Sequence, residues 1–163
     1  MTTLLPIPTT LQIDSPLGPL RLFAADGALC GLFLPNHSPK LIAGDGPPDP
    51  VLQLAAEQLR EYFAGDRRDF SVPLRAAGTE FQHTVWRALR AIPHGETRSY
   101  GALAQSIARP GASRAVGHAN SKNPISIVVP CHRVIGSGGA LTGYAGGAAA
   151  KQWLLAHEAP MAR

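Results

Sequence analysis

The chain opens with a loose alternation of apolar and polar residues. Between residues 11 and 34 this alternation is broken by two turn signals, Ser15-Pro16-Leu17-Gly18-Pro19 and Asp26-Gly27. A period of two places successive side chains on opposite faces of a strand. The pattern therefore predicts two or three short antiparallel strands.

A segment rich in proline and glycine, residues 35–50, follows these strands and predicts a loop. Over residues 51–63 the apolar residues recur at helical spacing, and Gly65 supplies a stop signal. A further strand is expected over residues 69–74. Together these elements predict a small α+β unit that ends near Ala77.

The second half of the chain has the pattern of short helices. Thr79 and Gln82 form a candidate capping box for a helix that ends near residue 91. Ser99 is expected to cap a helix over residues 100–108, and Ser113 another that ends near residue 121. Two short helices joined by a tight, glycine-containing turn are typical of a helix-turn-helix, although many such hairpins never contact DNA. A last helix is expected over residues 148–157.

We therefore predict an α+β fold with two small domains. Residues 1–77 would form an N-terminal domain with a short antiparallel sheet and one helix. Residues 78–163 would form a mainly helical C-terminal domain with the helix-turn-helix. A composition of 45% hydrophobic and 16% charged residues is sufficient for a buried core. The chain has neither an apolar run of about 18 residues nor the pattern of a signal peptide, so we expect no membrane association and a cytoplasmic location.

Charge is distributed unevenly along the chain. Residues 1–78 carry six Lys/Arg and eight Asp/Glu, whereas residues 79–163 carry nine Lys/Arg and three Asp/Glu. A basic C-terminal half favours a polyanionic partner such as DNA, with an ordinary solvated surface as the alternative. Four basic residues there are candidate phosphate contacts: Arg87, Arg98, Arg109 and Lys122.

The chain has two cysteines, Cys30 and Cys131, and neither belongs to a pattern with metal-ligand spacing, so we expect no metal. An ordinary thiol is only a few per cent ionised at neutral pH, and a nucleophilic one needs a base that is itself oriented. His132 and Glu158 could form such a relay with Cys131, and Asn123 could fix the turn beneath it. A purely structural Cys-His pair is the alternative.

Five blocks of sequence around Cys131 add specific information. The blocks, in order, are Ile92-Pro93-His94-Gly95-Glu96 with Ser99-Tyr100, Arg114-Ala115-Val116-Gly117 with Asn123-Pro124, Pro130-Cys131-His132-Arg133-Val134, Thr142-Gly143-Tyr144-Ala145-Gly146-Gly147, and Lys151-Gln152-Trp153-Leu154-Leu155. In order and spacing, residues 79–158 closely resemble the O6-alkylguanine-DNA alkyltransferase family (methylated-DNA–protein-cysteine methyltransferases). A weaker likeness occurs at Asp14-Ser15-Pro16-Leu17-Gly18.

The resemblance implies DNA repair by a single-turnover transfer of an alkyl group, methyl above all, from O6 of guanine to Cys131, with O4 of thymine as a second candidate position. It implies that the N-terminal domain is ribonuclease H-like. The catalytic relay would be Cys131, His132, Glu158 and Asn123. Substrate would be bound by Tyr100, Val134, Tyr144, Ala145 and Lys151. The residues expected to contact DNA, through the minor groove, are Arg114, Ser99, Ser113, Ala115 and Gly117.

In this assignment Arg114 enters the base stack while the target base is extruded, since O6 is inaccessible inside a duplex. Displacement at the alkyl carbon leaves a thioether on Cys131, and the sequence shows no cofactor site that could remove it. We therefore expect one turnover and no cofactor, with double-stranded DNA as the partner of a protein that is monomeric in solution. Ala145 departs from the family, which often has serine there, so a hydroxyl near O6 is missing. The zinc-binding residues and the four-cysteine regulatory domain of some relatives are absent as well.

Three other classes of protein remain as alternatives. Alkyltransferase-like binding proteins share the fold but lack the acceptor cysteine, so Cys131 argues against them. A helix-turn-helix regulator would prefer a sequence motif, and would bind it as a dimer. A cysteine hydrolase would have a local signature beyond one Cys and one His, and none is present.

Overall fold

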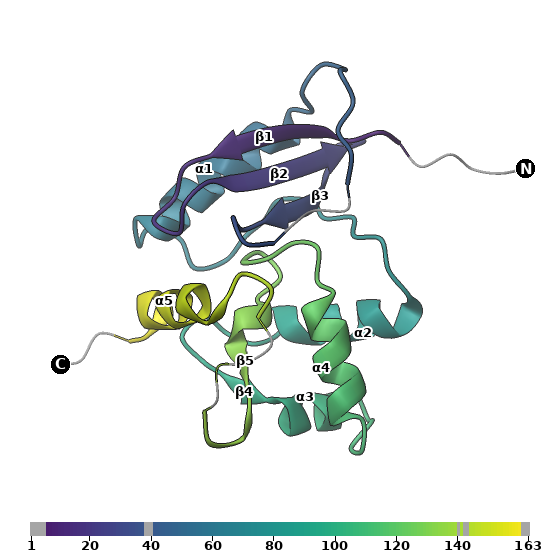
Figure 1. Ribbon diagram of the computed structural model, residues 1–163, viewed down its shortest axis with the longest axis vertical. Helices are drawn as coiled ribbons and strands as arrows, with labels where there is room; N and C mark the ends of the chain where they lie inside the picture. The colour runs from purple at the N-terminus through teal and green to yellow at the C-terminus, as the bar shows by residue number, and fades with distance from the viewer. Residues whose placement is uncertain (1–5, 38–40, 140, 142–143, 161–163) are drawn as a thin grey trace, which may run out of the picture. The chain divides into compact units, whose positions relative to one another are not determined.

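The computed structural model describes residues 6–37, 41–139, 141 and 144–160. The chain forms two compact units, Met1–Ala77 and Gly78–Arg163, which Figure 1 shows with their elements labelled. Among the described residues, no helix has both the length and the apolar character needed to cross a membrane.

The first unit is a three-stranded antiparallel sheet covered by one helix. Strands β1 (Thr9–Ile13), β2 (Leu20–Ala25) and β3 (Ala28–Phe33) lie in the order β1-β2-β3. Helix α1 (Val51–Phe63) packs against the sheet (Figure 1). This arrangement confirms the antiparallel strands and the helix predicted from the pattern of apolar residues.

Helix α1 buries one face, and its start is tied to the β2-β3 turn. Its apolar residues at helical spacing lie in the core (Leu52, Ala55, Ala56, Leu59 and Tyr62). The Asp49 carboxylate accepts hydrogen bonds from the backbone N–H groups of Val51 (3.0 Å) and Gly27 (2.8 Å). The helix therefore begins where an acidic side chain satisfies one of its first unpaired donors.

The strand expected over residues 69–74 is wrong. The segment makes only an isolated parallel bridge between Leu74 and Leu29. The Leu29 N–H donates to the Pro73 carbonyl at 2.8 Å, and the Arg75 N–H donates to the Leu29 carbonyl at 2.9 Å. Pro73 has no N–H of its own, and a proline at this place prevents a longer ladder.

The second unit is mainly helical, as predicted. It contains α2 (Glu80–Arg90), α3 (Tyr100–Ser106), α4 (Ser113–Ser121) and α5 (Ala148–Glu158), with the short 3₁₀ helices η1 (Cys131–Arg133) and η2 (Ser137–Gly139) (Figure 1). Helices α2, α3 and α4 pack against one another, and α5 packs against η1. The capping box is present, because the Gln82 N–H donates to Thr79 Oγ1 and the Thr79 N–H donates to Gln82 Oε1.

The two helices of the helix-turn-helix begin in different ways. Ser99 caps α3, and its Oγ accepts from the Ala102 N–H at 3.0 Å. The cap expected at Ser113 is wrong, because the capping position of α4 is Ala112, whose carbonyl accepts from the Val116 N–H at 2.9 Å. Ser113 is thus the first residue inside the helix, and its side chain is exposed.

A two-residue parallel ladder joins the start of α3 to the segment after Cys131. Strand β4 (Arg98–Ser99) pairs with β5 (Val134–Ile135), in the register Arg98 to Val134 and Ser99 to Ile135. The pairing was not predicted, because two residues are too few to show a period in the sequence. It places the cap of α3 beside the segment that follows Cys131.

Candidate active site

The segment before Cys131 is a series of tight turns instead of a strand. The Val128 N–H donates to the Ser126 carbonyl at 2.8 Å, which makes Ile127, with φ of 72°, the centre of a three-residue turn. Positive φ is a rare and strained conformation for a β-branched residue, and such strain persists only where the surrounding structure holds it. Ile127 is buried. The turn before the nucleophile is therefore fixed by its packing.

Asn123 holds this series of turns together from the end of α4. Its Nδ2 donates to the Val129 carbonyl at 2.8 Å, and its Oδ1 accepts from the Ile125 N–H at 3.0 Å. Its side chain also favours the ionised form of the Cys131 thiol through a hydrogen bond. Asn123 therefore fixes the turn that precedes Cys131.

The Cys131 thiol is 5% exposed. Burial raises its pKa to about 11, and the Asn123 hydrogen bond and the positive charge of Lys151 offset only part of that effect. At neutral pH the resting thiol is therefore protonated. Since the thiolate is the nucleophilic form, this cysteine needs a proton acceptor at the moment of reaction.

His132 and Glu158 form a buried pair next to that thiol. His132 is 0% exposed and Glu158 is 3% exposed, and His132 Nε2 lies 2.8 Å from Glu158 Oε2. Burial lowers the pKa of His132, in opposition to the hydrogen bond and the charge of Glu158. A carboxylate only accepts hydrogen bonds, so Nε2 of the neutral imidazole carries the proton and Nδ1 is the acceptor.

His132 Nδ1 is buried and has no hydrogen-bond partner among the described residues. Among the described residues, the His132 ring makes no direct hydrogen bond to the Cys131 thiol, although the His132 backbone does and thereby favours the thiolate. A water molecule would therefore have to relay a proton from the thiol to the ring.

Two buried residues near Cys131 received no role from the sequence. Arg133 donates from Nε to Glu158 Oε1 at 2.8 Å and from Nη2 to Glu158 Oε2 at 3.1 Å. Asn120 donates from Nδ2 to the Cys131 carbonyl at 3.4 Å. The sequence does hold a signal for the role of Arg133. It lies between Cys131-His132 and an apolar pair, so its side chain is expected to be buried and to need an acidic partner. Glu158 is one of only three acids after residue 78.

The expected substrate-binding residues lie around the same turn. Lys151, fully buried, donates from Nζ to the Val134 carbonyl at 2.6 Å. Burial, followed by the charge of the nearby Cys131 thiolate, raises the pKa of Tyr144 well above its ordinary range. Ala145 is half-buried beside Tyr144. Thr142 and Gly143 of the same motif lie outside the described residues.

The helix-turn-helix carries a surface pocket of about 410 Å³. Its lining includes most of the residues expected to contact DNA, together with Tyr100: Ser99, Tyr100, Gly101, Ser113, Arg114 and Gly117. Ala115 is exposed on the same helix but does not line the pocket. A side-chain carbon on Gly117 would lie 3.7 Å from the Tyr100 ring, so the glycine leaves room beside that ring.

Tyr100 connects this pocket to the cysteine. It lines the pocket, and burial followed by the charge of the Cys131 thiolate raises its pKa. Two groups whose charges affect one another in this way lie close together. The pocket, the β4-β5 ladder and Tyr100 therefore place an exposed surface next to a buried thiol.

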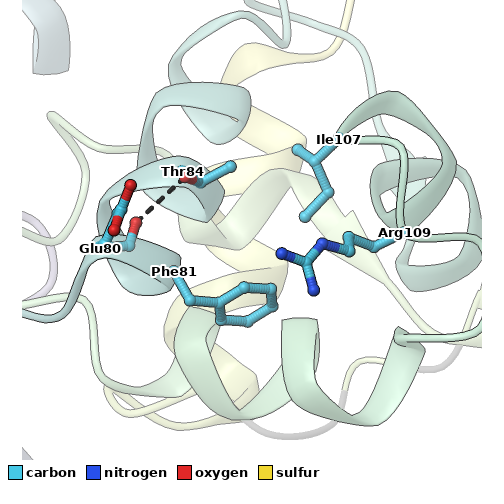
Figure 2. A pocket seen from close by; sticks show the side chains of 5 residues that line it. All are labelled: Glu80, Phe81, Thr84, Ile107 and Arg109. Atoms are coloured by element: carbon cyan, nitrogen blue, oxygen red, sulfur yellow. Dashed lines mark hydrogen bonds between the residues drawn. The ribbon is translucent and has the colours of Figure 1, made fainter.

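A second pocket, of about 320 Å³, lies between the start of α2 and the end of α3 (Figure 2). Its lining residues are Glu80, Phe81, Thr84, Ile107 and Arg109. The Arg109 guanidinium lies over the Phe81 ring, 6.0 Å from its centroid, and Thr84 Oγ1 donates to the Glu80 carbonyl at 3.0 Å. Arg109 thus lines a pocket different from the one that contains Arg114.

The arrangement defines a class of protein: a helix-turn-helix DNA-binding protein with a buried cysteine next to a buried His–Glu pair. No group of three His, Cys, Asp or Glu residues within the described ranges could hold a metal ion. The chain belongs to the 6-O-methylguanine DNA methyltransferase family. Residues 10–76 match its ribonuclease-like domain, and residues 80–160 match its DNA binding domain.

Similar proteins agree with this assignment. The methylated-DNA–protein-cysteine methyltransferase of Mycolicibacterium paratuberculosis is 51% identical over 90% of this chain and 89% of its own length. That of Mycobacterium tuberculosis is 51% identical over 88% of this chain and 87% of its own. The crystal structure of Mycobacterium tuberculosis OGT in complex with DNA has a TM-score of 0.85 and 49% identity, and the match covers 92% of each chain. The family predicted from the five sequence blocks is thereby confirmed.

Proposed function

We propose that this chain repairs alkylated DNA by transferring an alkyl group directly from O6 of guanine to the Cys131 thiol. The observation that carries the proposal is a buried thiol beside the His132–Glu158 pair, in the same unit as a helix-turn-helix pocket. Relatives that are half identical to this chain are named methylated-DNA–protein-cysteine methyltransferases. The chain therefore acts as a DNA alkyltransferase.

DNA binding is the task of the helix-turn-helix in residues 78–163, whereas residues 1–77 supply the ribonuclease H-like domain. Arg114, exposed in the first turn of α4, enters the base stack from the minor groove and replaces the stacking of the extruded base. Ser99, Ser113 and Gly117, which line the same pocket, contact the DNA backbone together with Ala115, which is exposed on the same helix. Extrusion costs a few kcal/mol, and a weakened base pair lowers that cost, which favours lesions over normal guanine.

The extruded base passes Tyr100 and enters the space around Cys131. The Cys131 and Val134 carbonyls accept hydrogen bonds from the guanine amine, in addition to those from Asn120 and the Val134 N–H at Cys131 and from Lys151 at Val134. Tyr144 forms a wall of the alkyl pocket. The backbone N–H of Ala145 donates to O6, or to O4 of an alkylated thymine, in place of the missing hydroxyl.

Proton transfer makes the nucleophile. His132 Nδ1 takes the thiol proton through one water, and Glu158 stabilises the imidazolium that forms. Sγ then attacks the alkyl carbon, the carbon–O6 bond breaks, and its electron pair stays with guanine. Guanine takes up a proton at N1, so the net reaction moves one alkyl group and one proton. The thioether has no leaving group, and each molecule reacts once.

The experiment is the intact mass of the protein after incubation with duplex DNA that carries one O6-methylguanine. We expect a gain of one methyl group, mapped to the peptide that contains Cys131, and no more than one equivalent of repaired guanine. Cys30→Ser is the matched control and should gain the methyl group, whereas Cys131→Ser should not. Selective binding without any mass change would instead indicate a lesion-recognition protein.

The proposal extends to the state in which the protein works. Because the substrate is DNA, we place the protein in the cytoplasm, with one copy of the chain on each lesion. Analytical ultracentrifugation of the protein with a short lesion-bearing duplex should give a complex of one chain and one duplex. Two copies of the chain bound as a dimer to a palindromic site would contradict this expectation.

A further inference from the structure

Arg133 is a buried charge to which the alkyl transfer described above assigns no role. It is 5% exposed and makes three hydrogen bonds. Nε and Nη2 donate to the two carboxylate oxygens of Glu158, at 2.8 and 3.1 Å, and Nη1 donates to the Ile92 carbonyl at 2.7 Å. Arg133 thus joins α5 to the segment that follows α2, through the turn that contains the nucleophile.

The two-pronged contact fixes the plane of the Glu158 carboxylate. Two parallel N–H···O bonds give an arginine–carboxylate pair a defined orientation that a single bond does not. Glu158 Oε2 accepts from both Arg133 Nη2 and His132 Nε2. The position of the imidazole ring, and hence the direction in which Nδ1 points, therefore depends on Arg133 through Glu158.

In the part of the chain that the structure describes, three charged side chains act on the pKa of His132. Glu158 and Lys151 face it from α5, and Arg133 and the neutral Cys131 thiol flank it in η1. A buried carboxylate alone beside a buried imidazole would favour an imidazolium, because the ion pair would satisfy the carboxylate. Arg133 already pairs with the Glu158 carboxylate through a permanent positive charge. The carboxylate therefore stabilises a second proton on His132 less than it would without Arg133.

We propose that Arg133 is a positioning residue that keeps the resting His132 neutral, with its proton on Nε2 and Nδ1 open to accept the Cys131 proton. Without Arg133, His132 would be an imidazolium over a wider pH range, and in that form it could take no proton from the thiol. The inference deepens the proposed function and rests on it. This role can be distinguished from a purely structural role of Arg133, because loss of a structural contact would lower the transfer rate equally at every pH.

The test compares Arg133→Gln with the wild-type protein and with Arg133→Lys. Glutamine keeps one donor but has no charge, whereas lysine keeps the charge and loses the two-pronged geometry. The rate of methyl transfer from an O6-methylguanine duplex is measured in single-turnover conditions from pH 5.5 to 9. The imidazole nitrogens of His132 are followed over the same range by ¹⁵N NMR of the protein without DNA.

In Arg133→Gln we expect the His132 pKa, and with it the acid limb of the rate profile, to move upward by roughly one to three pH units. One unit below that midpoint the rate falls about tenfold, and at high pH it returns to within about threefold of wild type. In Arg133→Lys the acid limb stays within about half a unit of wild type. Arg90→Gln removes an exposed arginine at the end of α2 and should change nothing.

A wild-type rate profile and unchanged His132 signals in Arg133→Gln would overturn the inference, as would an equal loss at every pH. If Arg133→Gln does not fold, the wild-type NMR titration decides, because an imidazolium at pH 7 contradicts the proposal and a neutral ring protonated at Nε2 supports it. A wild-type protein that transfers no methyl group would instead refute the proposed function, which the NMR measurement does not depend on.

Discussion

The ammonium group of Lys151 lies 2.6 Å from the carbonyl oxygen of Val134, and neither residue is exposed to solvent. This hydrogen bond joins α5 to β5, the strand that follows the nucleophile. The same ammonium group favours the thiolate of Cys131. Lys151 therefore contributes both to the position of the turn and to its chemistry.

Lys151→Met removes the hydrogen bond to Val134 and the positive charge near Cys131 but keeps the packing, because methionine fills a similar volume without a charge. We expect methyl transfer to slow by about tenfold or more, since the Cys131 pKa rises further once the cation is removed. Unfolding should become easier by about 1–3 kcal/mol, the cost of leaving the buried Val134 carbonyl unpaired. Single-turnover kinetics and urea denaturation measure the two effects. Lys151→Arg, which keeps the charge, should lose less transfer activity, and equal losses in both variants would contradict the electrostatic part.

The stability of the protein should fall in mildly alkaline solution because of Cys131. Burial raises its pKa from the ordinary 9.0 to about 11, so the folded state holds the thiol proton more tightly than the unfolded state does. This contribution is complete below pH 9 and is lost as the pH rises towards 11. Its size is about 2–3 kcal/mol at 1.36 kcal/mol per pH unit.

Urea denaturation of the wild type and of Cys131→Ala at pH 8, 9, 10 and 10.5 isolates this effect, because all other titrating groups are shared. Above pH 9 the free energy of unfolding of the wild type should decrease relative to that of Cys131→Ala. A difference that stays constant over this range would show that the thiol is not desolvated as described.

Glu158→Gln should be among the most damaging single changes in the second unit. The amide cannot balance Arg133, and it leaves an unpaired buried cation beside His132. We expect a loss of about 3–5 kcal/mol in stability and a fall in the transfer rate of at least about a hundredfold. Glu96→Gln is the matched control, since Glu96 pairs with Arg98 on the surface, where such a pair contributes about 0–1 kcal/mol. Comparable losses in the two variants would refute the importance of burial.

Arg114→Ala should affect substrates according to whether their base must be extruded. Transfer from O6-methylguanine within a duplex should slow by about tenfold or more, because the gap in the base stack is left unfilled. Transfer from O6-methylguanine as an isolated base should stay within about twofold of wild type, as no extrusion is involved. Both rates come from the same mass measurement, and a parallel loss on both substrates would assign Arg114 to the chemistry instead.

The strands and helices with a clear period could be predicted from the sequence, and the tight turns could not. The alternation over residues 11–34 and the helical spacing over residues 51–63 each reflect one buried face. Pro73 was the signal against the strand expected at residues 69–74. The β4-β5 ladder and the turn at Ile127 depend on contacts between distant segments, which leave no period in the chain.

The candidate site was predictable in its members but not in its connections. Cys131 and His132 could be named because a motif block carries them, and Glu158 because it ends the stretch that resembles the family; the structure pairs His132 with Glu158. The pairing of Arg133 with Glu158 could be suggested by the scarcity of acids after residue 78, but the 24 residues between them do not show that α5 folds back onto η1. A charge pair between distant segments is visible only once the chain is folded.

A nucleophile that can be used only once must survive until it meets its target. Oxidation by peroxide requires a thiolate within reach of solvent, and susceptibility follows both conditions. The resting Cys131 meets neither, because it is 5% exposed and keeps its proton up to about pH 11. Cys30, which is partly exposed, should therefore be oxidised first. The burial that leaves the resting thiol protonated should therefore also extend the working lifetime of the unreacted protein in the presence of peroxide.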